Sequence, residues 1–425
     1  LTRNSQGGPA KVAIFASALF GTISGSAAAN VYGTGTFTIP LMKKVGYTPH
    51  FAGAVEAVAS TGGQMMPPIM GAAAFIMADV IGVSYLTIAK AALIPSVLYY
   101  LTLLAIIHLE AVSKNMGTLP PELVPSAASG LRRLYYLFPL VFLITILLMG
   151  RSVIACAYYG TVCIVILSMI RSETRFTFKR LCGALELSAK NAMMVSSCCA
   201  CAGIIIGVIS LTGIGYKFIN VITALAGSNL LLLMAMLMVT CIILGMGMPV
   251  PAAYVLTATL AAPALLEFKF SLMSAHLFIV YFSAISAITP PVAVAAYAAA
   301  GISEGDPNAT GVQAVRLAVA AYIVPFVFMY RPALILDGSL PEILWTAVVA
   351  TAAVYSFASG LEGYLHGRLR FPLRLALMAA GVVFVWPDTW ADLTGFAILG
   401  AVTAHQYAIR KNNPDPVCLA QPQGE

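Results

Sequence analysis

Two short segments combine serine and threonine hydroxyls with glycine and proline inside strongly apolar sequence. The first is Gly21-Thr-Ile-Ser-Gly-Ser26, and the second is Ser60-Thr-Gly-Gly-Gln-Met-Met-Pro-Pro68. Hydroxyl oxygens, together with backbone carbonyls freed where a helix breaks, can form the oxygen cage that Na⁺ requires. Within lipid, non-helical backbone survives only where protein buries it or where it lines a cavity. The two segments therefore predict an ion or substrate site near the middle of a membrane.

The same arrangement returns 223 residues later without a gap. Pro40 maps onto Pro263, Ser60 onto Ser283, and the pair Pro67-Pro68 onto Pro290-Pro291. The turn at Ser24-Gly25-Ser26 falls on Gly247-Met248-Pro249. Ala29, Thr34 and Thr36 also map onto Ala252, Thr257 and Thr259, but such matches count for little in an alanine-rich chain, so the spacing of the prolines carries more weight. We interpret the pattern as an internal repeat.

The composition indicates a helical membrane protein with several spans. Apolar residues make up 60% of the chain and charged residues only 9%, with a mean hydropathy of +0.92, whereas soluble domains carry about 25% charged residues. The net charge of +7 is therefore interpreted through membrane topology, and no nucleic-acid partner is expected. The cluster Cys198-Cys-Ala-Cys201 has no His at ligand spacing, so we interpret it as helix packing and expect no metal there.

The spans are expected to be all α-helical, with two re-entrant hairpins and two broken crossing helices. Residues 12 to 42 are too long for one crossing and too short for two with a turn, so they predict a hairpin with its tip at Ser24–Ser26. One long tilted helix with a glycine kink is the alternative. Residues 51 to 78 predict the first broken helix, residues 230 to 266 the second hairpin and residues 276 to 300 the second broken helix.

The remaining segments complete the topology. Ordinary spans are expected at 85–107, 134–149, 152–170 and 189–209, a polar connection at 110–133, and a basic interfacial connection at 171–190. The predicted domains are a first repeat over 1–110, connecting scaffold helices over 111–188, a second repeat over 189–337 and a hydrophobic extension with a polar tail over 338–425. Because the chain starts at Leu1 and enters apolar sequence almost at once, we expect it to be an N-terminally truncated part of a longer protein.

The distribution of positive charge favours an inverted repeat. Five crossings separate the two hairpins, so the second hairpin enters from the face opposite the first. On this assignment only five of the 23 Lys and Arg residues lie outside, namely Lys90, Arg151, Lys217, Lys269 and Arg331. The other 18 lie at or near the cytoplasm, as the positive-inside rule requires.

The oxygen-bearing breaks provide the candidate site residues. In the first half, ion or substrate binding is predicted at Ser24, Gly25, Ser26, Asn30, Ser60, Thr61, Gly62, Gly63, Pro67 and Pro68. In the second half it is predicted at Gly245, Gly247, Met248, Pro249, Ser283, Ser286, Thr289, Pro290 and Pro291. Na⁺ itself is assigned to Ser24, Ser26, Thr61, Gly62, Ser286 and Thr289, and the half-helix N-termini favour an anionic substrate group. Close packing of small residues is the alternative interpretation of both breaks.

Three ionisable residues lie inside the predicted spans or near their ends. Glu56 is the one carboxylate well inside a span of the first half, and both a functional role and a shallow, water-facing position fit it. His276 and His405 stand near predicted span ends and are interpreted as interfacial.

Enzyme functions fit poorly. The residue two before Ser24 is Thr22 rather than the Gly of a rhomboid-type nucleophile motif, and Asp79, Asp337 and Asp388 stand at span ends rather than paired within spans. No glycine-rich phosphate loop followed by Lys is present, so ATP hydrolysis by this chain is not expected.

The motifs GTISGSAAANVYGTGTFTIPLMKKVGY, STGGQMMPPIMGAAAF and SAITPPVAVAAYAAAG resemble the large membrane subunit of tripartite ATP-independent periplasmic (TRAP) transporters. The resemblance covers residues 8 to 336 and is nearest to fused permeases that pair with TAXI-type binding proteins, whose C-terminal tails the extension also resembles. It implies a multi-pass protein of the bacterial inner membrane that imports an organic anion with Na⁺ as coupling ion and no other cofactor. It also implies elevator movement, a periplasmic substrate-binding protein, and a small membrane subunit or fused N-terminal helices.

Transport is therefore the expected function, with a carboxylate as the substrate class. The alternatives are an ion-coupled symporter or antiporter of the same superfamily that needs no binding protein, and a non-transporting membrane scaffold.

Overall fold

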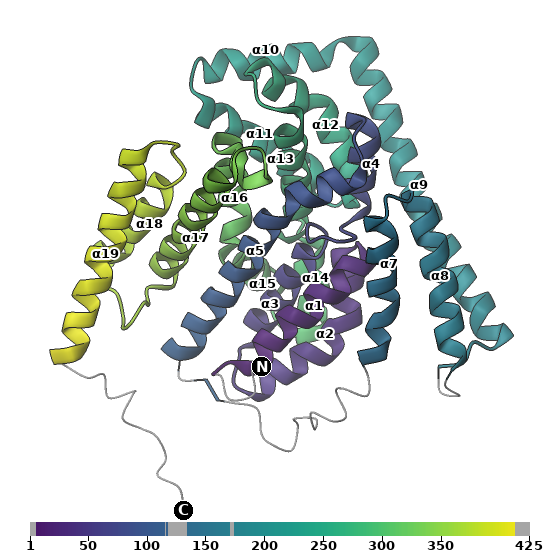
Figure 1. Cartoon of the computed structure of the whole chain (residues 1–425), viewed down its shortest axis with the longest axis horizontal. Coiled ribbons are helices and arrows are strands. Elements are labelled where there is room, and N and C mark those ends of the chain that lie inside the picture. The colour runs from purple at the N-terminus through teal and green to yellow at the C-terminus, as the bar shows by residue number, and fades with distance from the viewer. Residues whose placement is uncertain (1–5, 115, 118–133, 171–173, 413–425) are drawn as a thin grey trace, which may run out of the picture.

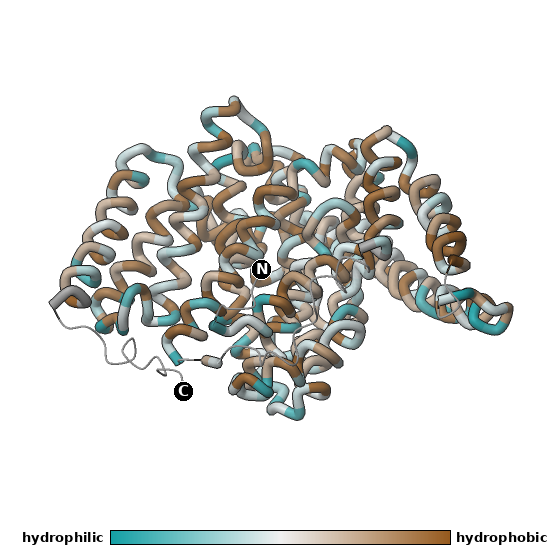
Figure 2. Tube along the Cα trace, turned by 60° about the horizontal axis from the view of Figure 1, so that its bottom comes forward, coloured by the Kyte–Doolittle hydropathy of each residue, from teal (hydrophilic) through white to brown (hydrophobic). Residues whose placement is uncertain are grey.

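The computed structural model describes residues 6–114, 116–117, 134–170 and 174–412, and these residues form an assembly of helices (Figure 1). Five of the described helices are long and apolar enough to cross a membrane, and they are listed here by their bounds: Tyr85–Ser113, Phe178–Thr212, Val250–Glu267, Pro307–Tyr330 and Leu340–Glu362. Hydrophobic residues cover most of the helices, while hydrophilic residues gather at helix ends and connections (Figure 2). The chain is thus an all-α, polytopic membrane protein, as its composition predicts.

The first repeat begins with a helical hairpin. Helix α1 spans Gly8–Ser24 and helix α2 spans Ala27–Lys44, and we call the pair hairpin 1. Gly25 has a left-handed backbone (φ +61°), and Ser26 caps α2 by accepting a hydrogen bond from the Ala29 N–H at 3.4 Å. Glycine adopts this conformation without the steric cost that a β-carbon brings, and serine is a favoured N-cap residue. The turn predicted from Ser24-Gly25-Ser26 is therefore confirmed, and the single kinked helix is excluded.

The predicted broken helix is present as two helices with a non-helical segment between them. Helix α3 spans Pro49–Gly62 and helix α4 spans Ala72–Ile81. The segment between them includes a cis peptide bond at Pro67-Pro68. Helix α5 (Tyr85–Ser113) then crosses beside the pair.

The second repeat follows the first with nearly the same helix bounds. Helices α11 (Leu230–Gly245) and α12 (Val250–Glu267) form hairpin 2, and helix α13 spans Leu272–Ile285. The bounds of α12 and α13 equal those of α2 and α3 plus 223. A short helix, η3 (Ser286–Ile288), a cis Pro290-Pro291 bond and helix α14 (Val294–Ser303) complete the second broken segment.

The hairpins enter from opposite ends of the molecule. In Figure 1 helix α1 starts from the marked N-terminus in the lower part of the view, whereas α10 (Ile214–Ala226), which leads into α11, lies across the top. Helices α3 and α14 are in contact, as are α2 and α14, so the two repeats interlock. This arrangement agrees with the inverted repeat that the charge distribution predicts.

The remaining helices surround the hairpins. They are listed here in chain order: η2 (Leu134–Leu137), α7 (Phe138–Leu148), α8 (Val153–Met169), α9 (Phe178–Thr212), α15 (Pro307–Leu317), α16 (Val319–Tyr330), η4 (Pro332–Ile335), α17 (Leu340–Glu362), α18 (Phe371–Val383) and α19 (Thr389–Asn412). Helices α17, α18 and α19 correspond to the predicted C-terminal extension and lie to one side of the hairpins (Figure 1). Helix α17 packs against α5 and α16, which joins the extension to the body of the protein.

Two expectations about the connections have different outcomes. Helix α9 runs without interruption from Phe178 to Thr212. The prediction of an interfacial connection at 171–190 followed by a separate span at 189–209 is therefore wrong over the described residues. The 35 residues of α9 correspond to roughly 52 Å of helix, and most of its side chains are exposed. The predicted domain boundary at 188 falls inside α9, and the division into domains stays a prediction. The polar connection at 110–133 lies largely outside the described residues.

Candidate functional site

The tip of hairpin 1 lies in the break between α3 and α4. A β-carbon added at Gly63 would lie 2.4 Å from the Gly21 Cα, so these two backbones touch. A β-carbon added at Gly25 would lie 3.5 Å from both the Gly71 Cα and the Met70 carbonyl oxygen. Only glycines permit the approach of Gly21 to Gly63. The contact that was expected of Ser24–Ser26 with Thr61–Gly63 is thus made by Gly21, in the last turn of α1, whereas Gly25 at the tip lies beside Met70 and Gly71.

The broken segment of the first repeat is held in place by hydroxyl groups from α5. Ser96 Oγ donates to the Met65 carbonyl at 2.6 Å, and Tyr85 Oη donates to the Pro68 carbonyl at 3.0 Å and to the Ile69 carbonyl. Tyr99 and Tyr100 donate to the carbonyls of Val58 and Ala59 near the end of α3. A helix break frees carbonyl groups that need partners, and α5 supplies several of them. The sequence pattern gave no indication that α5 has this role.

The hydroxyls predicted to hold Na⁺ in the first repeat are bonded within their own segments. Ser24 Oγ donates to the Ser26 carbonyl at 3.4 Å, and Thr61 Oγ1 donates to the Ala57 carbonyl at 2.8 Å. Ser26 is exposed, whereas Thr61 has no exposed surface. A hydroxyl that donates to a carbonyl keeps its lone pairs for a cation, so these bonds are compatible with ion binding. The assignment of Na⁺ to these residues stays a prediction.

Hairpin 2 repeats the same relationship with different side chains. A β-carbon added at Gly245 would lie 2.7 Å from Ser286 Oγ, so the tip of hairpin 2 rests on η3. Ser286 Oγ donates to the Ser283 carbonyl at 2.7 Å, and Thr289 Oγ1 is 2.8 Å from the Tyr322 hydroxyl of α16. Gly245, one residue before the predicted Met246–Pro249, therefore contacts Ser286, the first residue of the predicted Ser286–Pro290.

The remaining predicted residues of the second repeat lie along the same break. A β-carbon added at Gly247 (φ +77°) would lie 3.5 Å from the Val292 side chain, which places this turn beside the Pro290-Pro291 loop. Pro290 packs against α15, where a β-carbon added at Gly311 would lie 3.0 Å from its ring, and the Pro291 carbonyl accepts a hydrogen bond from Tyr297 at 2.7 Å. Met248 and Pro249 are half-buried at the start of α12.

Asn30 lies inside hairpin 1 rather than at its tip. Its side chain is fully buried, and its Nδ2 donates to the Ser17 carbonyl of α1 at 2.8 Å. Asn30 therefore joins the two arms of the hairpin. This contact leads to a polar cluster around Glu56.

Glu56 is completely buried, which excludes the shallow, water-facing position. Its carboxylate accepts hydrogen bonds from Ser17 at 2.6 Å, from Thr34 and Thr38 at 2.5 Å each, and from Ser60 at 3.3 Å. Ser60, predicted to line the ion site, thus points to Glu56. Ser17, Thr34 and Thr38 were not predicted, although the four-residue spacings Thr34/Thr38 and Glu56/Ser60 place each pair on one helix face.

The interfacial position expected for His276 is wrong. His276 is 5% exposed, and its Nδ1 lies 2.8 Å from the Tyr254 hydroxyl of α12. Its place near the start of α13 suggested a span end, but hairpin 2 covers this part of the helix.

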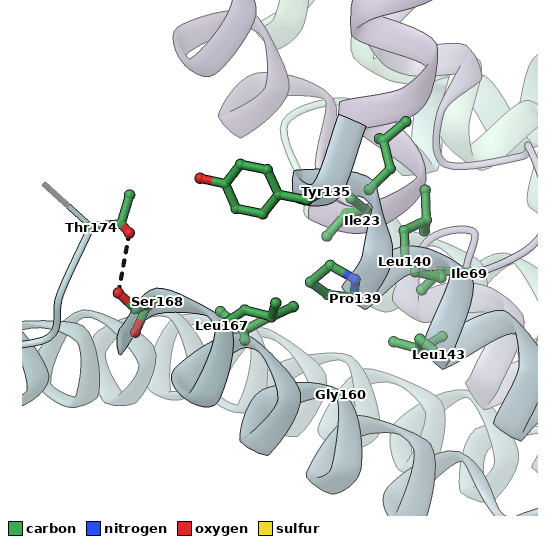
Figure 3. Close-up of a pocket in the computed structure, with 12 residues that line it drawn as sticks. Ile23, Ile69, Tyr135, Pro139, Leu140, Leu143, Gly160, Leu167, Ser168 and Thr174 are labelled. Carbon is green, nitrogen blue, oxygen red and sulfur yellow. Dashed lines mark hydrogen bonds between the residues drawn. The ribbon is translucent and has the colours of Figure 1, made fainter. Parts of the chain in front are cut away.

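An apolar pocket of about 320 Å³ lies beside the tip of hairpin 1 (Figure 3). Ile23 of α1 and Ile69 of the broken segment face residues of α7 and α8 such as Leu140 and Leu167. Its few polar atoms include Thr174 Oγ1, which donates to the Ser168 carbonyl at 3.1 Å. An anionic substrate would find little to bind there, so we assign no substrate site to this pocket.

No group of three or more His, Cys, Asp or Glu residues suited to hold a metal ion occurs among the described residues. The cysteines at 198, 199 and 201 lie on helix α9, half-buried or exposed.

Comparison with known proteins supports the transport interpretation. Residues 4–343 match the family described as the DctM component of the tripartite ATP-independent periplasmic transporter. A 98-residue stretch is 35% identical to the uncharacterised protein YgiK of Salmonella typhimurium and covers 23% of this chain and 22% of YgiK. A 117-residue stretch is 27% identical to the uncharacterised protein y4mL of Sinorhizobium fredii and covers 28% of this chain and 27% of y4mL. The chain thus matches about a quarter of the length of these relatives, whereas the family match covers most of the chain.

This family consists of transporters rather than enzymes, and its members work with a periplasmic binding protein and a small membrane subunit. The chain belongs to the DctM family of large TRAP transporter components and is an integral protein of the inner membrane.

Proposed function

We propose that this chain is the permease that imports an organic anion, most simply a carboxylate, together with Na⁺. The observation that carries the proposal is the seating of each hairpin tip in the broken helix of its own repeat, at Gly21–Gly63 and at Gly245–Ser286. Paired breaks of this kind provide ion and substrate sites that can be opened to one side of a membrane at a time.

The N-termini of four helices at the tips support an anionic substrate. Helix α2 starts directly after the tip of hairpin 1, and helix α4 starts beside it, since a β-carbon added at Gly25 would lie 3.7 Å from the Ala72 nitrogen. Helix α12 starts directly after the tip of hairpin 2, and α14 starts two residues after Val292, whose side chain would lie 3.5 Å from a β-carbon added at Gly247. Helix N-termini carry partial positive charge and unpaired N–H groups, each favouring an anion by about 0.3–1 kcal/mol at exposed sites.

The helix packing supports a moving unit and a static frame. Hairpin 1 and α3 contact α14, and α3 also contacts α15, so the two repeats form one body around the breaks. Helix α5 bonds the first break and belongs to this body, whereas helices α7 and α8 pack on each other and form a second group. We propose that the first body moves against the second in an elevator-type cycle, and that substrate arrives from a periplasmic binding protein of the TAXI class.

The test is uptake by the full-length permease, reconstituted with its small subunit or fused helices. A labelled carboxylate should accumulate only when an inward Na⁺ gradient and the binding protein are both present. Uptake without the binding protein would identify a binding-protein-independent symporter or antiporter. If no gradient and no binding protein support uptake, the chain is a non-transporting scaffold and the proposal fails.

A further inference from the structure

Glu56 is held by hydroxyl groups from three helices. Ser17 comes from α1, Thr34 and Thr38 come from α2, and Ser60 comes from the same helix as Glu56, α3. Glu56, Ser17 and Ser60 have no exposed surface, and Thr38 is 8% exposed. The carboxyl group therefore joins both arms of hairpin 1 to the helix whose broken end receives the hairpin tip.

None of the ion pairs formed by the described residues includes Glu56. The helices packed on α3 are α1, α2, α5, α14 and α15, together with η3. Most of their charged and titratable side chains contact other groups: Lys11 bonds His108, Lys43 bonds the Ser303 carbonyl, Glu110 pairs with Lys114, Arg316 pairs with Glu362, Tyr85 donates to the Pro68 carbonyl, Tyr99 and Tyr100 donate to α3 carbonyls, and Tyr297 donates to Pro291. Tyr32 and Lys44 of α2 and Lys90 of α5 are exposed. A buried carboxylate without a counter-charge is strongly disfavoured. A cation must therefore accompany Glu56 for at least part of the time that it is buried.

The geometry accommodates a proton without rearrangement of heavy atoms. Glu56 Oε1 accepts from Ser17, Thr34 and Ser60, whereas Oε2 accepts from Thr38 alone. Thr38 Oγ1 also lies 3.1 Å from the Thr34 carbonyl. When Oε2 carries a proton, it can donate to Thr38 Oγ1 while Thr38 turns its own proton to the Thr34 carbonyl. Thr34 has the same choice, because its Oγ1 lies 2.9 Å from the Asn30 carbonyl.

We propose that Glu56 binds and releases a proton during each transport cycle, in addition to the Na⁺ proposed at the hairpin tips. This proposal rests on the proposed transport function. The ionised carboxylate draws four hydroxyls to itself and holds hairpin 1 against α3, and protonation weakens these bonds, since hydrogen bonds to a charged acceptor are roughly twice as strong as neutral ones. Binding of the proton to Glu56 thereby frees hairpin 1 to move relative to α3.

The path that a proton would take between the surface of hairpin 1 and Glu56 is short. Thr34 bonds Glu56 directly and is half-buried, so a single hydroxyl separates the carboxyl group from the surface of hairpin 1. The second repeat has no equivalent group. Ile279 stands at the position that corresponds to Glu56, and Ser283 bonds Thr257 at 3.1 Å instead of a carboxylate. We therefore expect one proton for each permease molecule.

The first experiment measures substrate accumulation by the complete transporter in vesicles, with the Na⁺ gradient fixed and the membrane potential clamped. An imposed pH gradient, acidic on the side from which substrate enters, should raise accumulation about tenfold per pH unit for one proton carried with each substrate. Glu56→Gln keeps the size and hydrogen bonding of the protonated form, and it should lose this response while substrate exchange continues. Glu186→Gln removes an exposed carboxylate that pairs with Lys190, and it should respond like the wild type.

A second pair of variants tests the hydroxyl arrangement. Thr38→Val removes the hydrogen-bond partner of Glu56 Oε2. It should move the midpoint of the pH dependence of substrate uptake, while a pH gradient should still raise substrate accumulation. Thr102→Val is the matched control, because Thr102 is a buried threonine of α5 that donates to the Leu98 carbonyl of its own helix. Its pH profile should equal that of the wild type.

A measurement without transport separates this proposal from the proposed function. Infrared difference spectra of the purified permease between acidic and alkaline pH should contain a carboxylic-acid band that Glu56→Gln abolishes. If this band titrates but no gradient drives uptake, Glu56 binds a proton outside a transport cycle and the proposal is overturned together with the proposed function. If Na⁺ shifts a Glu56-dependent band at constant pH and protons do not, the cluster is a Na⁺ site. Identical spectra and identical pH responses of the wild type and Glu56→Gln also overturn the proposal.

Discussion

Gly21 and Gly63 touch through their backbones where hairpin 1 crosses the end of helix α3. A β-carbon added at Gly21 would lie 2.8 Å from the Gly63 Cα, and one added at Gly63 would lie 2.4 Å from the Gly21 Cα. Both atoms are backbone, so neither can turn aside as the end of a flexible side chain can. The position of the hairpin tip in the break therefore depends on the absence of two methyl groups.

Gly63→Ala should consequently destabilise the purified permease by about 1–3 kcal/mol, the usual cost of overpacking a close-packed contact. The measurement is the thermal unfolding midpoint in detergent. Gly203→Ala is the matched control, since Gly203 lies in helix α9 and a β-carbon there would meet nothing within 4 Å. That variant should be neutral or slightly stabilising, because alanine is the better helix former. Equal midpoints for Gly63→Ala and the wild type would contradict the close backbone contact.

The buried ion pair between Arg331 and Asp392 should fix the C-terminal helices to the body. The Arg331 Nη2 and Asp392 Oδ1 atoms lie 2.5 Å apart, and the Trp345 Nε1 donates to Asp392 Oδ2 at 3.0 Å. Arg331, which the charge assignment placed outside, is thus enclosed by protein, with 8% of its surface exposed. Asp392→Ala leaves the Arg331 charge buried and alone, so we expect a loss of about 3–5 kcal/mol.

The measurement for this pair is the unfolding midpoint together with limited proteolysis of the C-terminal helices. Glu186→Ala provides the control, because Glu186 and Lys190 form an exposed pair on α9. An exposed pair contributes only about 0–1 kcal/mol, so that variant should unfold and digest like the wild type. A similar result for Asp392→Ala would show that helices α17–α19 are held by apolar packing alone.

Ser26→Ala and Thr61→Ala should each raise the Na⁺ concentration that gives half-maximal uptake. Loss of one oxygen ligand should cost on the order of 1–3 kcal/mol of ion binding, by analogy with an unmade buried polar contact. The measurement is the Na⁺ dependence of initial uptake rates at saturating substrate. Thr161→Val, on helix α8 and bonded to its own Ala157 carbonyl, is the control and should keep the wild-type Na⁺ dependence. Unchanged Na⁺ dependence in both Ser26→Ala and Thr61→Ala would remove Na⁺ from this tip.

The ends of the two hairpins should be accessible from opposite faces of the membrane. Lys43 lies in the last turn of α2, and Lys269 lies two residues after the end of α12. Single cysteines introduced at the two positions, in a background without reactive native cysteines, should be labelled by an impermeant thiol reagent from the cytoplasm at Lys43→Cys and from the periplasm at Lys269→Cys. Labelling of both from one side would show that the repeat is parallel.

The breaks and the repeat could be predicted from the sequence because their causes are local. Gly25 permits the left-handed turn at one tip, Ser26 caps the following helix, and the paired prolines at 67–68 and 290–291 remove the two successive N–H donors that a helix would need there. The all-helical membrane architecture also follows from composition, since lipid leaves few alternatives to helices for an apolar chain. The neighbourhood of each tip and its own break follows from the repeat.

The remaining features were decided by packing between helices that are distant in sequence. Glu56 stood inside an expected span at a depth that the pattern left open, and His276 stood near an expected span end. Hairpin 1 covers Glu56 and hairpin 2 covers His276, so their burial depends on which helices pack against them. The hydroxyls of α5 that bond the first break, the ion pair between Arg331 and Asp392, and the uninterrupted course of α9 are tertiary in the same sense. A sequence pattern shows which groups need partners, but only the folded chain shows which groups provide them, because a buried polar group can be satisfied by any element that comes within hydrogen-bonding distance.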